Sequence, residues 1–284
     1  MASSSSRLRF VSYNVKQFVG STGECTIEAI GQSLAKLNPT VVCLNEVDLN
    51  RWPDTLERFG RALGVSNVEF YGHVRNGNYG NAVCSSLPLE QCKATQLKGG
   101  SRIKFEDKVH QIVRGLLVCS IDGSPVGLPK FTVAATHLDH MSEDERRVQL
   151  KHVREVLESV KTERNEPVVL CGDFNALKRK DYEDQHWQQL EDRHRERGWA
   201  MPSHGCLDEL ENHGYLDCFH HVDLDTPPTP TASVEEPLYR IDYCFAGPGF
   251  LEHFNLHSAS VQNAICLSDH FPIVIDFSHK SSKM

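Results

Sequence analysis

The stretch PVVLCGDFN, residues 167–175, carries the pattern from which the fold follows. A short apolar run that contains β-branched residues is bounded by Pro167 and Gly172, which is typical of a buried strand over Pro167–Asp173. Asp173 and Asn175 stand at its end, although strand propensity alone does not favour them there. The stretch therefore predicts a buried strand that carries a carboxylate and an amide at its carboxyl end.

The same pattern occurs at seven further places along the chain. Each run is short, contains β-branched or aromatic residues, and is bounded by Gly, Pro, Asn or Asp. The further expected strands are Leu8–Tyr13, Val41–Glu46, Ala82–Ser85, Ile112–Ile121, Phe131–His137, Arg240–Phe245 and Phe271–Phe277.

Segments with helical patterns separate these strands. The clearest is Ser142–Val160, which Ser142 and Glu145 open as a capping box. Its apolar stripe keeps helical spacing and consists of Val148, Val153, Val156, Leu157 and Val160. The other expected helices are Glu24–Leu37, Pro53–Leu63 and Asp181–Arg197.

The order of the elements predicts one domain in which sheets pack face to face with helices outside. No Gly, Ser or Pro linker is long enough to divide the chain, and the Pro-rich tract TPPTPT, residues 226–231, fits a surface loop. We expect the domain to span residues 7–278, with flexible tails at 1–6 and 279–284.

Composition excludes several classes of protein. Hydrophobic residues make up 39% of the 284 residues and charged residues 24%, which is not the composition of a disordered or coiled-coil chain. Lys and Arg number 30 against 38 Asp and Glu, so the net charge of −8 argues against binding to DNA or anionic lipid by bulk electrostatics. No apolar run approaches the ~18 residues of a membrane span, and no secretory signal opens the chain.

The ten cysteines indicate a reduced, intracellular protein. Several, such as Cys43 and Cys171, lie inside apolar strand-like runs, where a thiol behaves as a small hydrophobic group. No CxxC motif occurs.

Polar residues stand at the ends of six of the apolar runs. They comprise acids, imidazoles and amides: Asn14, Glu46, His137, Asp173, Asn175, Asp242, Asp269 and His270. We expect them to converge on one edge of the sheets. Carboxylates and amides without thiolates suit Mg²⁺ or Mn²⁺ better than Zn²⁺. Because no nucleophilic Ser or Cys stands in a recognisable motif, the set indicates phosphoester hydrolysis by direct attack of water.

The chain resembles the endonuclease/exonuclease/phosphatase superfamily, which includes pancreatic deoxyribonuclease. The matching motifs occur in family order between residues 10 and 277: SYNV (12–15), LNEV (44–47), GNAV (80–83), THLD (136–139), CGDFN (171–175), RIDY (240–243) and SDHFP (268–272). Asn45 departs from the Gln usual before the metal-binding glutamate. The resemblance implies a four-layer α/β sandwich in which two mixed β-sheets pack face to face and are flanked by helices.

The resemblance also implies a role for each site residue. Glu46 would be the principal Mg²⁺ ligand, with Asp269 and Asn14 on the same metal side, and Mn²⁺ would substitute. Asp173 would orient and deprotonate the attacking water, while Asn14 and Asn175 would donate to phosphate oxygens. His270, held by Asp242, would contact the phosphate and assist proton transfer, and His137 would stabilise charge on the phosphorus centre or leaving oxygen.

Four further features stand outside this set, and three of them allow two interpretations. Arg114, in an expected strand, is a candidate phosphate contact. The basic run 178–180 either meets a polyanionic substrate or forms a solvated helix start. Asp139 and His140 either line the site or belong to a loop that enters the following helix, which we favour. The His- and Cys-rich region 186–221 is a surface insertion or, less in keeping with its spacing, a zinc site.

The substrate class stays open at the level of sequence. The leading candidate is a phosphodiesterase or nuclease that acts on nucleic acid or its ends. The alternatives are a phospholipid or small phosphorylated metabolite as substrate, and an inactive binding scaffold. The last three residues, Ser282-Lys283-Met284, differ from the peroxisomal signal S-K-L only at the final position, so a peroxisomal import receptor is a candidate partner and the peroxisome a candidate location beside the cytoplasm and nucleus.

Overall fold

The computed structural model describes residues 7–105, 107–223 and 228–280. Its first six-stranded sheet has the order β13-β14-β1-β2-β4-β3. In that order the strands are Phe254–Val261, Ile273–His279, Arg7–Asn14, Val41–Asp48, Tyr79–Ser85 and Asn67–Val74. Strands β1 and β2 are parallel, and the other neighbours pair antiparallel.

The second six-stranded sheet has the order β11-β12-β10-β9-β8-β5. Its strands are Leu216–Asp217, Asp242–Ala246, Val168–Asp173, Phe131–His137, Gly115–Ile121 and Leu89–Gln96. Only β9 and β10 among these neighbours are parallel. The two mixed sheets pack face to face around a core that includes Phe10 and Phe131, whose rings meet edge to face at 5.9 Å.

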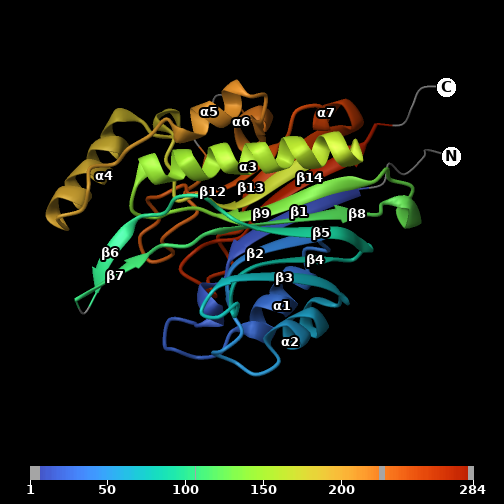
Figure 1. Cartoon of the computed structure of the whole chain (residues 1–284), viewed down its shortest axis with the longest axis horizontal. Coiled ribbons are helices and arrows are strands. Elements are labelled where there is room, and N and C mark those ends of the chain that lie inside the picture. Colours follow the sequence, from blue (N-terminus) through green and yellow to red (C-terminus); the bar gives the residue numbers. More distant parts are fainter. Residues whose placement is uncertain (1–6, 106, 224–227, 281–284) are drawn as a thin grey trace.

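Helices cover the outer faces of both sheets, which confirms the expected four-layer α/β sandwich (Figure 1). Helices α1 (Ile27–Ala35) and α2 (Thr55–Leu63) share a buried cluster with the first sheet. Helices α3 (Glu143–Arg164) and α5 (Cys206–Asn212) do the same with the second sheet. The remaining helices are α4 (Asp184–Glu196), α6 (Cys218–Val222) and α7 (Phe250–His253), with 3₁₀ turns at Lys16–Phe18, Ser124–Val126 and Arg179–Asp181.

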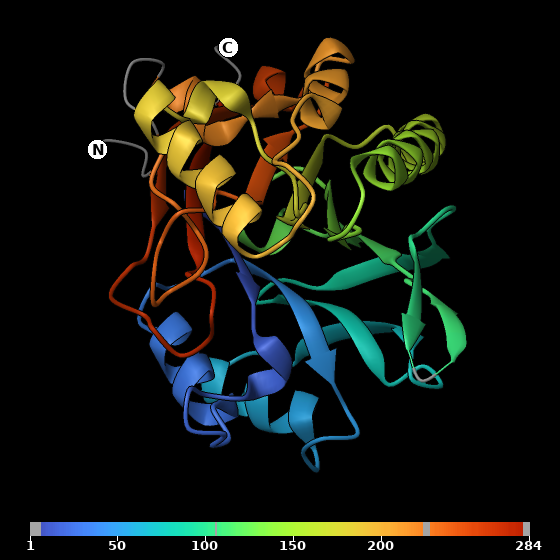
Figure 2. The same cartoon turned by 90° about the vertical axis from the view of Figure 1, so that its left-hand side faces the viewer.

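Several strands escaped prediction because they lie at sheet edges or outside the sheets. Edge strands β3, β5 and β13 have polar, partly exposed residues rather than a buried apolar run. A separate hairpin of β6 (Arg102–Phe105) and β7 (Lys108–Gln111) extends away from both sheets (Figures 1 and 2). The expected strand Ile112–Ile121 therefore begins only at Gly115, after this hairpin has returned to the sheet.

Helix α3 differs in two details from the expected capping box and apolar stripe. Ser142 Oγ accepts from Glu145 N at 3.4 Å, but the Glu145 carboxylate accepts from Gly100 N at 2.6 Å instead of returning to Ser142. Ser142 N donates to Asp139 Oδ1, so only half of the capping box forms. Val148 is 46% exposed and lies off the buried stripe.

The carboxyl end of the domain extends further than expected. Strand β14 includes His279, and Lys280 N donates to His253 O at 2.8 Å, so this part of the expected tail belongs to the fold. The Ser282-Lys283-Met284 sequence and the tail 1–6 lie outside the described residues, as do residues 226–227 of the Pro-rich tract. No helix among the described residues is long and apolar enough to cross a membrane. All ten cysteines are free thiols.

Candidate active site

The polar residues predicted at strand ends meet at one edge of the two sheets. Asn14 ends β1, and His137 and Asp173 end the parallel strands β9 and β10. His270 precedes the last strand, β14, as expected, whereas Asp242 begins β12 instead of lying inside the expected strand Arg240–Phe245. Because these two strands run antiparallel to β10 and β1, their beginnings lie at the same edge as the other strands' ends.

Asp173 is the centre of the site. Its side chain is 2% exposed and accepts hydrogen bonds from Asn14 Nδ2 at 2.9 Å and from Asn175 N at 2.9 Å. Burial and the neighbouring Asp242 carboxylate raise the pKa of Asp173 to about 7, against the effect of His270. A carboxylate with this pKa can accept a proton near neutral pH.

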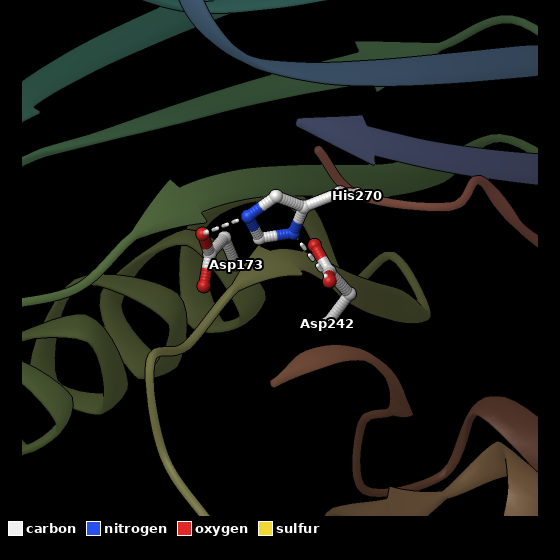
Figure 3. A group of neighbouring side chains, drawn as sticks. All are labelled: Asp173, Asp242 and His270. Atoms are coloured by element: carbon white, nitrogen blue, oxygen red, sulfur yellow. Dashed lines mark hydrogen bonds and ion pairs between the residues drawn. The ribbon is translucent and has the colours of Figure 1, made fainter. Parts of the chain in front are cut away.

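His270 lies between two acids. Its Nδ1 is 2.8 Å from Asp242 Oδ2 and its Nε2 is 3.7 Å from Asp173 Oδ2 (Figure 3). Burial alone lowers the pKa of His270, but the carboxylates of Asp242, Asp173 and Asp269 outweigh burial and raise the pKa to about 10. The imidazole is therefore oriented by Asp242 and carries a positive charge readily.

His137 approaches the same oxygen of Asp173 as His270 does, but it has different neighbours. Its Nε2 lies 3.6 Å from Asp173 Oδ2 and 3.0 Å from Asn175 Nδ2, while its Nδ1 lies 3.3 Å from Arg114. Burial and the Arg114 charge hold the pKa of His137 well below its usual range. His137 is thus a neutral imidazole in the same site as a readily charged one.

Glu46 and Asp269 are the two acids to which the resemblance assigns a metal ion. Glu46 has a φ of 59°, which turns its side chain out of the regular strand, and its Oε1 accepts from Asn14 Nδ2 at 3.1 Å. Asp269 Oδ2 is 3.1 Å from the Lys16 ammonium, and its side chain is 42% exposed. Both carboxylates are partly exposed, Glu46 contacts Asn14 and Asp269 lies beside a cation, so by their chemistry these oxygen donors suit a hard divalent ion.

Asn14 bridges two acids in the present arrangement. Its Nδ2 donates to both Glu46 and Asp173, and its Oδ1 accepts from Lys16 N at 3.1 Å. Asp173, Asp242 and His270 also present ligand atoms within 4.8 Å of one another, close enough for one ion. Within that group, His270 Nδ1 is hydrogen-bonded to Asp242 and its Nε2 faces Asp173.

The basic run 178–180 and Asp139 both contact other parts of the chain. Lys178 is 1% exposed at its side chain and pairs with Glu211 at 2.6 Å and Asp217 at 3.2 Å, so it is not part of a solvated helix start. The side chains of Arg179 and Lys180 are 36% and 51% exposed, and each is paired with an acid. Asp139 caps the loop that enters α3, as favoured, and accepts from Met141 N and Ser142 N. His140, beside it, contacts Arg114.

The His- and Cys-rich region contains no ligand cluster among the described residues. Across the described residues, the only group of three or more His, Cys, Asp or Glu side chains that could hold an ion is Asp173, Asp242 and His270, and this group lies outside region 186–221. His220 Nε2 lies 2.5 Å from Asp181 Oδ1, and the His204 ring packs on Trp187 at 5.5 Å. The surface-insertion interpretation is therefore better supported than a zinc site.

Sequence reasoning missed the buried polar residues that support the site. Arg240 is 1% exposed and pairs with Asp181 and Asp217 behind β12. Asn45 bonds to Asn81, Thr136 O and Asp173 N, and thereby joins the two sheets. The only sequence signal was their presence within the RIDY, LNEV and GNAV motifs.

A sequence model described as the Endonuclease/Exonuclease/phosphatase family matches residues 11–270, nearly the whole chain. The chain belongs to this family. Family members are phosphoesterases, so the fold is that of a hydrolase acting on phosphoesters. No protein among curated sequences matches the chain at a significant level.

Solved structures of the family share the fold at low sequence identity. The human Nocturnin catalytic domain with bound sulfate is 18% identical, with a TM-score of 0.67 over 96% of this chain and 94% of that chain. The Bacteroides thetaiotaomicron mannosyl-6-phosphatase is 17% identical, with a TM-score of 0.68 over 95% of this chain and 99% of that chain. TDP2 from Caenorhabditis elegans is 15% identical, with a TM-score of 0.63 over 96% of this chain and 74% of that chain.

Proposed function

We propose that the protein is a Mg²⁺-dependent phosphodiesterase of the nuclease type, which hydrolyses nucleic acid or its ends by direct attack of water. The observation that carries the proposal is the position of Asp173 between two imidazoles. His270 Nε2 lies 3.7 Å and His137 Nε2 lies 3.6 Å from the same carboxylate oxygen. A carboxylate flanked in this way combines a proton acceptor with donors for the charge that develops around phosphorus.

Each residue has a role that follows from its contacts. Asp173, with its raised pKa, orients the attacking water and takes its proton. Asn14 and Asn175 offer amide hydrogens to the non-bridging phosphate oxygens. Asp242 holds His270 through Nδ1, so that Nε2 faces Asp173 and the phosphate. Arg114 stands behind His137 and acts on the phosphate through it.

Glu46, Asp269 and Asn14 are the residues that would hold Mg²⁺, or Mn²⁺ in its place. The ion would supply positive charge to the phosphoryl oxygens and the leaving oxygen. The Lys16 ammonium, 3.1 Å from Asp269 Oδ2, already places one positive charge beside this carboxylate.

A panel of substrates tests the function. Purified protein is incubated with single-stranded and duplex oligonucleotides, thymidine 5′-monophosphate p-nitrophenyl ester, a phospholipid and sugar phosphates, each with Mg²⁺, with Mn²⁺ and with EDTA. We expect Mg²⁺-dependent turnover of the phosphodiesters, with EDTA abolishing it and Asp173→Asn inactive. Exclusive turnover of the lipid or the sugar phosphates would replace the proposed substrate class, and no turnover of any would favour the binding scaffold.

A further inference from the structure

Arg114 is a buried cation that has no carboxylate partner among the residues that the structure describes. It is 6% exposed, and no Asp or Glu oxygen there lies within 4.0 Å of its guanidinium nitrogens. Arg240, a buried cation that precedes β12, pairs with two carboxylates at 2.7–2.8 Å. A buried charge without an opposite charge beside it is costly, so its presence points to a task at this position.

The partners of Arg114 are two imidazoles, one at the end of β9 and one in the loop that follows it. Its NH1 lies 3.3 Å from His137 Nδ1 and its NH2 lies 3.0 Å from His140 Nδ1. A guanidinium can only donate hydrogen bonds, so both Nδ1 atoms must accept. Each ring is then neutral and carries its single proton on Nε2.

The Nε2 side of His137 faces the reaction centre. Asn175 Nδ2 lies 3.0 Å from this nitrogen, and Asp173 Oδ2 lies 3.6 Å from it. A neutral imidazole has one acceptor nitrogen, and the charged guanidinium competes for it better than an amide does. One hydrogen of the Asn175 amide goes to Leu138 O at 3.2 Å, and the other lies beside the His137 Nε2–H. These two adjacent donors have no shared acceptor among the described residues and match an anionic phosphoryl oxygen.

We propose that Arg114 is a positioning residue that fixes His137 and His140 as neutral Nε2–H donors, so that His137 stabilises phosphoryl charge without delivering a proton. The catalytic part of this inference rests on the proposed phosphodiesterase function. His270 has the opposite arrangement, because its Nδ1 faces the Asp242 carboxylate and donates to it. The two imidazoles of the site thus differ at Nδ1, which accepts in His137 and donates in His270, and proton transfer belongs to the Asp173–His270 side alone.

Imidazole ¹⁵N NMR of the full chain at neutral pH tests the positioning without any substrate. His137→Gln and His140→Gln assign the resonances. We expect both histidines to have a bare Nδ1 and a protonated Nε2, and Arg114→Met to lose this single tautomer. Arg102→Met, which removes an exposed cation from the hairpin before Arg114, is the matched control and leaves the tautomers unchanged. A proton on Nδ1 of either histidine in the wild-type protein overturns the proposal.

Kinetics on thymidine 5′-monophosphate p-nitrophenyl ester test the role of the donor. His137→Gln keeps a neutral donor that cannot release a proton, so we expect kcat within about tenfold of wild type. His137→Leu removes the donor and should lower kcat by about 10²-fold or more. Equal losses in the two folded variants would make His137 a general acid and refute the neutral-donor role. If the wild-type protein turns over no phosphodiester, the proposed function fails, and the NMR tautomers still decide the positioning by Arg114.

Discussion

At the scale of single residues, the two histidines of the candidate site differ in the group that each one contacts through Nδ1. His270 has a carboxylate at Nδ1, whereas His137 has a guanidinium there. The first partner favours a charged ring and the second a neutral one. Environments that separate the pKa values of like groups are a general means of dividing acid–base roles within one site.

The first prediction concerns Glu46, one of the residues proposed to hold the metal ion. Glu46→Gln keeps the shape of the side chain but removes the charge that would hold the ion, so we expect turnover at limiting Mg²⁺ to fall by roughly 10²-fold or more. Excess Mn²⁺ should restore part of it. Initial rates over a metal titration measure the effect, and Glu57→Gln, an exposed acid on α2, is the control. Near wild-type turnover of Glu46→Gln at limiting Mg²⁺ would remove Glu46 from the metal site.

The second prediction concerns the Asp242–His270 pair. Asp242→Asn cannot stabilise a charged imidazole and permits the wrong tautomer, so we expect a loss of about 10²–10⁴-fold in kcat. His270→Ala should cost a similar factor, and the double variant should be little worse than either single variant, because the two residues act as a unit. Losses that multiply in the double variant would show that the residues act independently.

At the scale of elements, Asp139 joins three segments around the site. Its carboxylate accepts from Ser101 N and Oγ at the base of the β6–β7 hairpin, and from Met141 N and Ser142 N where α3 begins. Its own backbone follows β9 and His137. One buried carboxylate thus fixes the loop that carries His140 relative to the hairpin and the helix.

Asp139→Ala should therefore destabilise the protein strongly. Four hydrogen bonds to a charged acceptor are lost and buried backbone donors are left without a partner, so we expect a decrease of roughly 3 kcal/mol in the free energy of unfolding. Ser101→Ala removes only the hydroxyl bond and should cost about 1 kcal/mol. Urea unfolding of the three proteins gives both values. An Asp139→Ala variant as stable as Ser101→Ala would mean that the hydrogen bonds of the Asp139 carboxylate contribute little to the free energy of unfolding.

At the scale of the whole molecule, a buried ionic network joins β11 and the residue Arg240 before β12 to the segment that follows β10. Arg240 joins Asp181 and Asp217, and Lys178 adds a second cation to Asp217. Burial raises the pKa of both acids, but the Arg240 charge outweighs burial and lowers the pKa of each below its ordinary value of 3.8. The folded state thus favours the ionised acids more strongly than the unfolded state does.

This network predicts a loss of stability in acid. Because the folded pKa values are lowered, the contribution of Asp181 and Asp217 is complete above about pH 4 and falls as the pH drops below the unfolded pKa of 3.8. Urea midpoints between about pH 6 and pH 2.5 should show a steep decline in the wild-type protein and a shallower one in Asp217→Asn. Asp184→Asn, which removes a 97% exposed acid, should follow the wild type. Equal slopes in all three proteins would contradict the prediction.

The sequence by itself determined the buried central strands and the polar residues beside them, and its ordered motifs pointed to the sandwich. The strands and their polar neighbours are local features: a run of β-branched residues such as 167–173 favours a buried strand, and an acid or amide at its end stands out against it. The strand over Phe131–His137 was predicted to the residue. Edge strands such as β5 were missed, because a partly exposed strand has no comparable pattern.

Only the tertiary structure decided which partner each charged residue has. Asn14 meets Asp173 across 159 residues of sequence, and Asn45 meets Asp173 across 128. Lys178 and Arg114 are both buried cations, yet one is paired with acids and the other with imidazoles. Such pairings depend on how two sheets and their loops pack, because the contacts join segments that no local pattern connects.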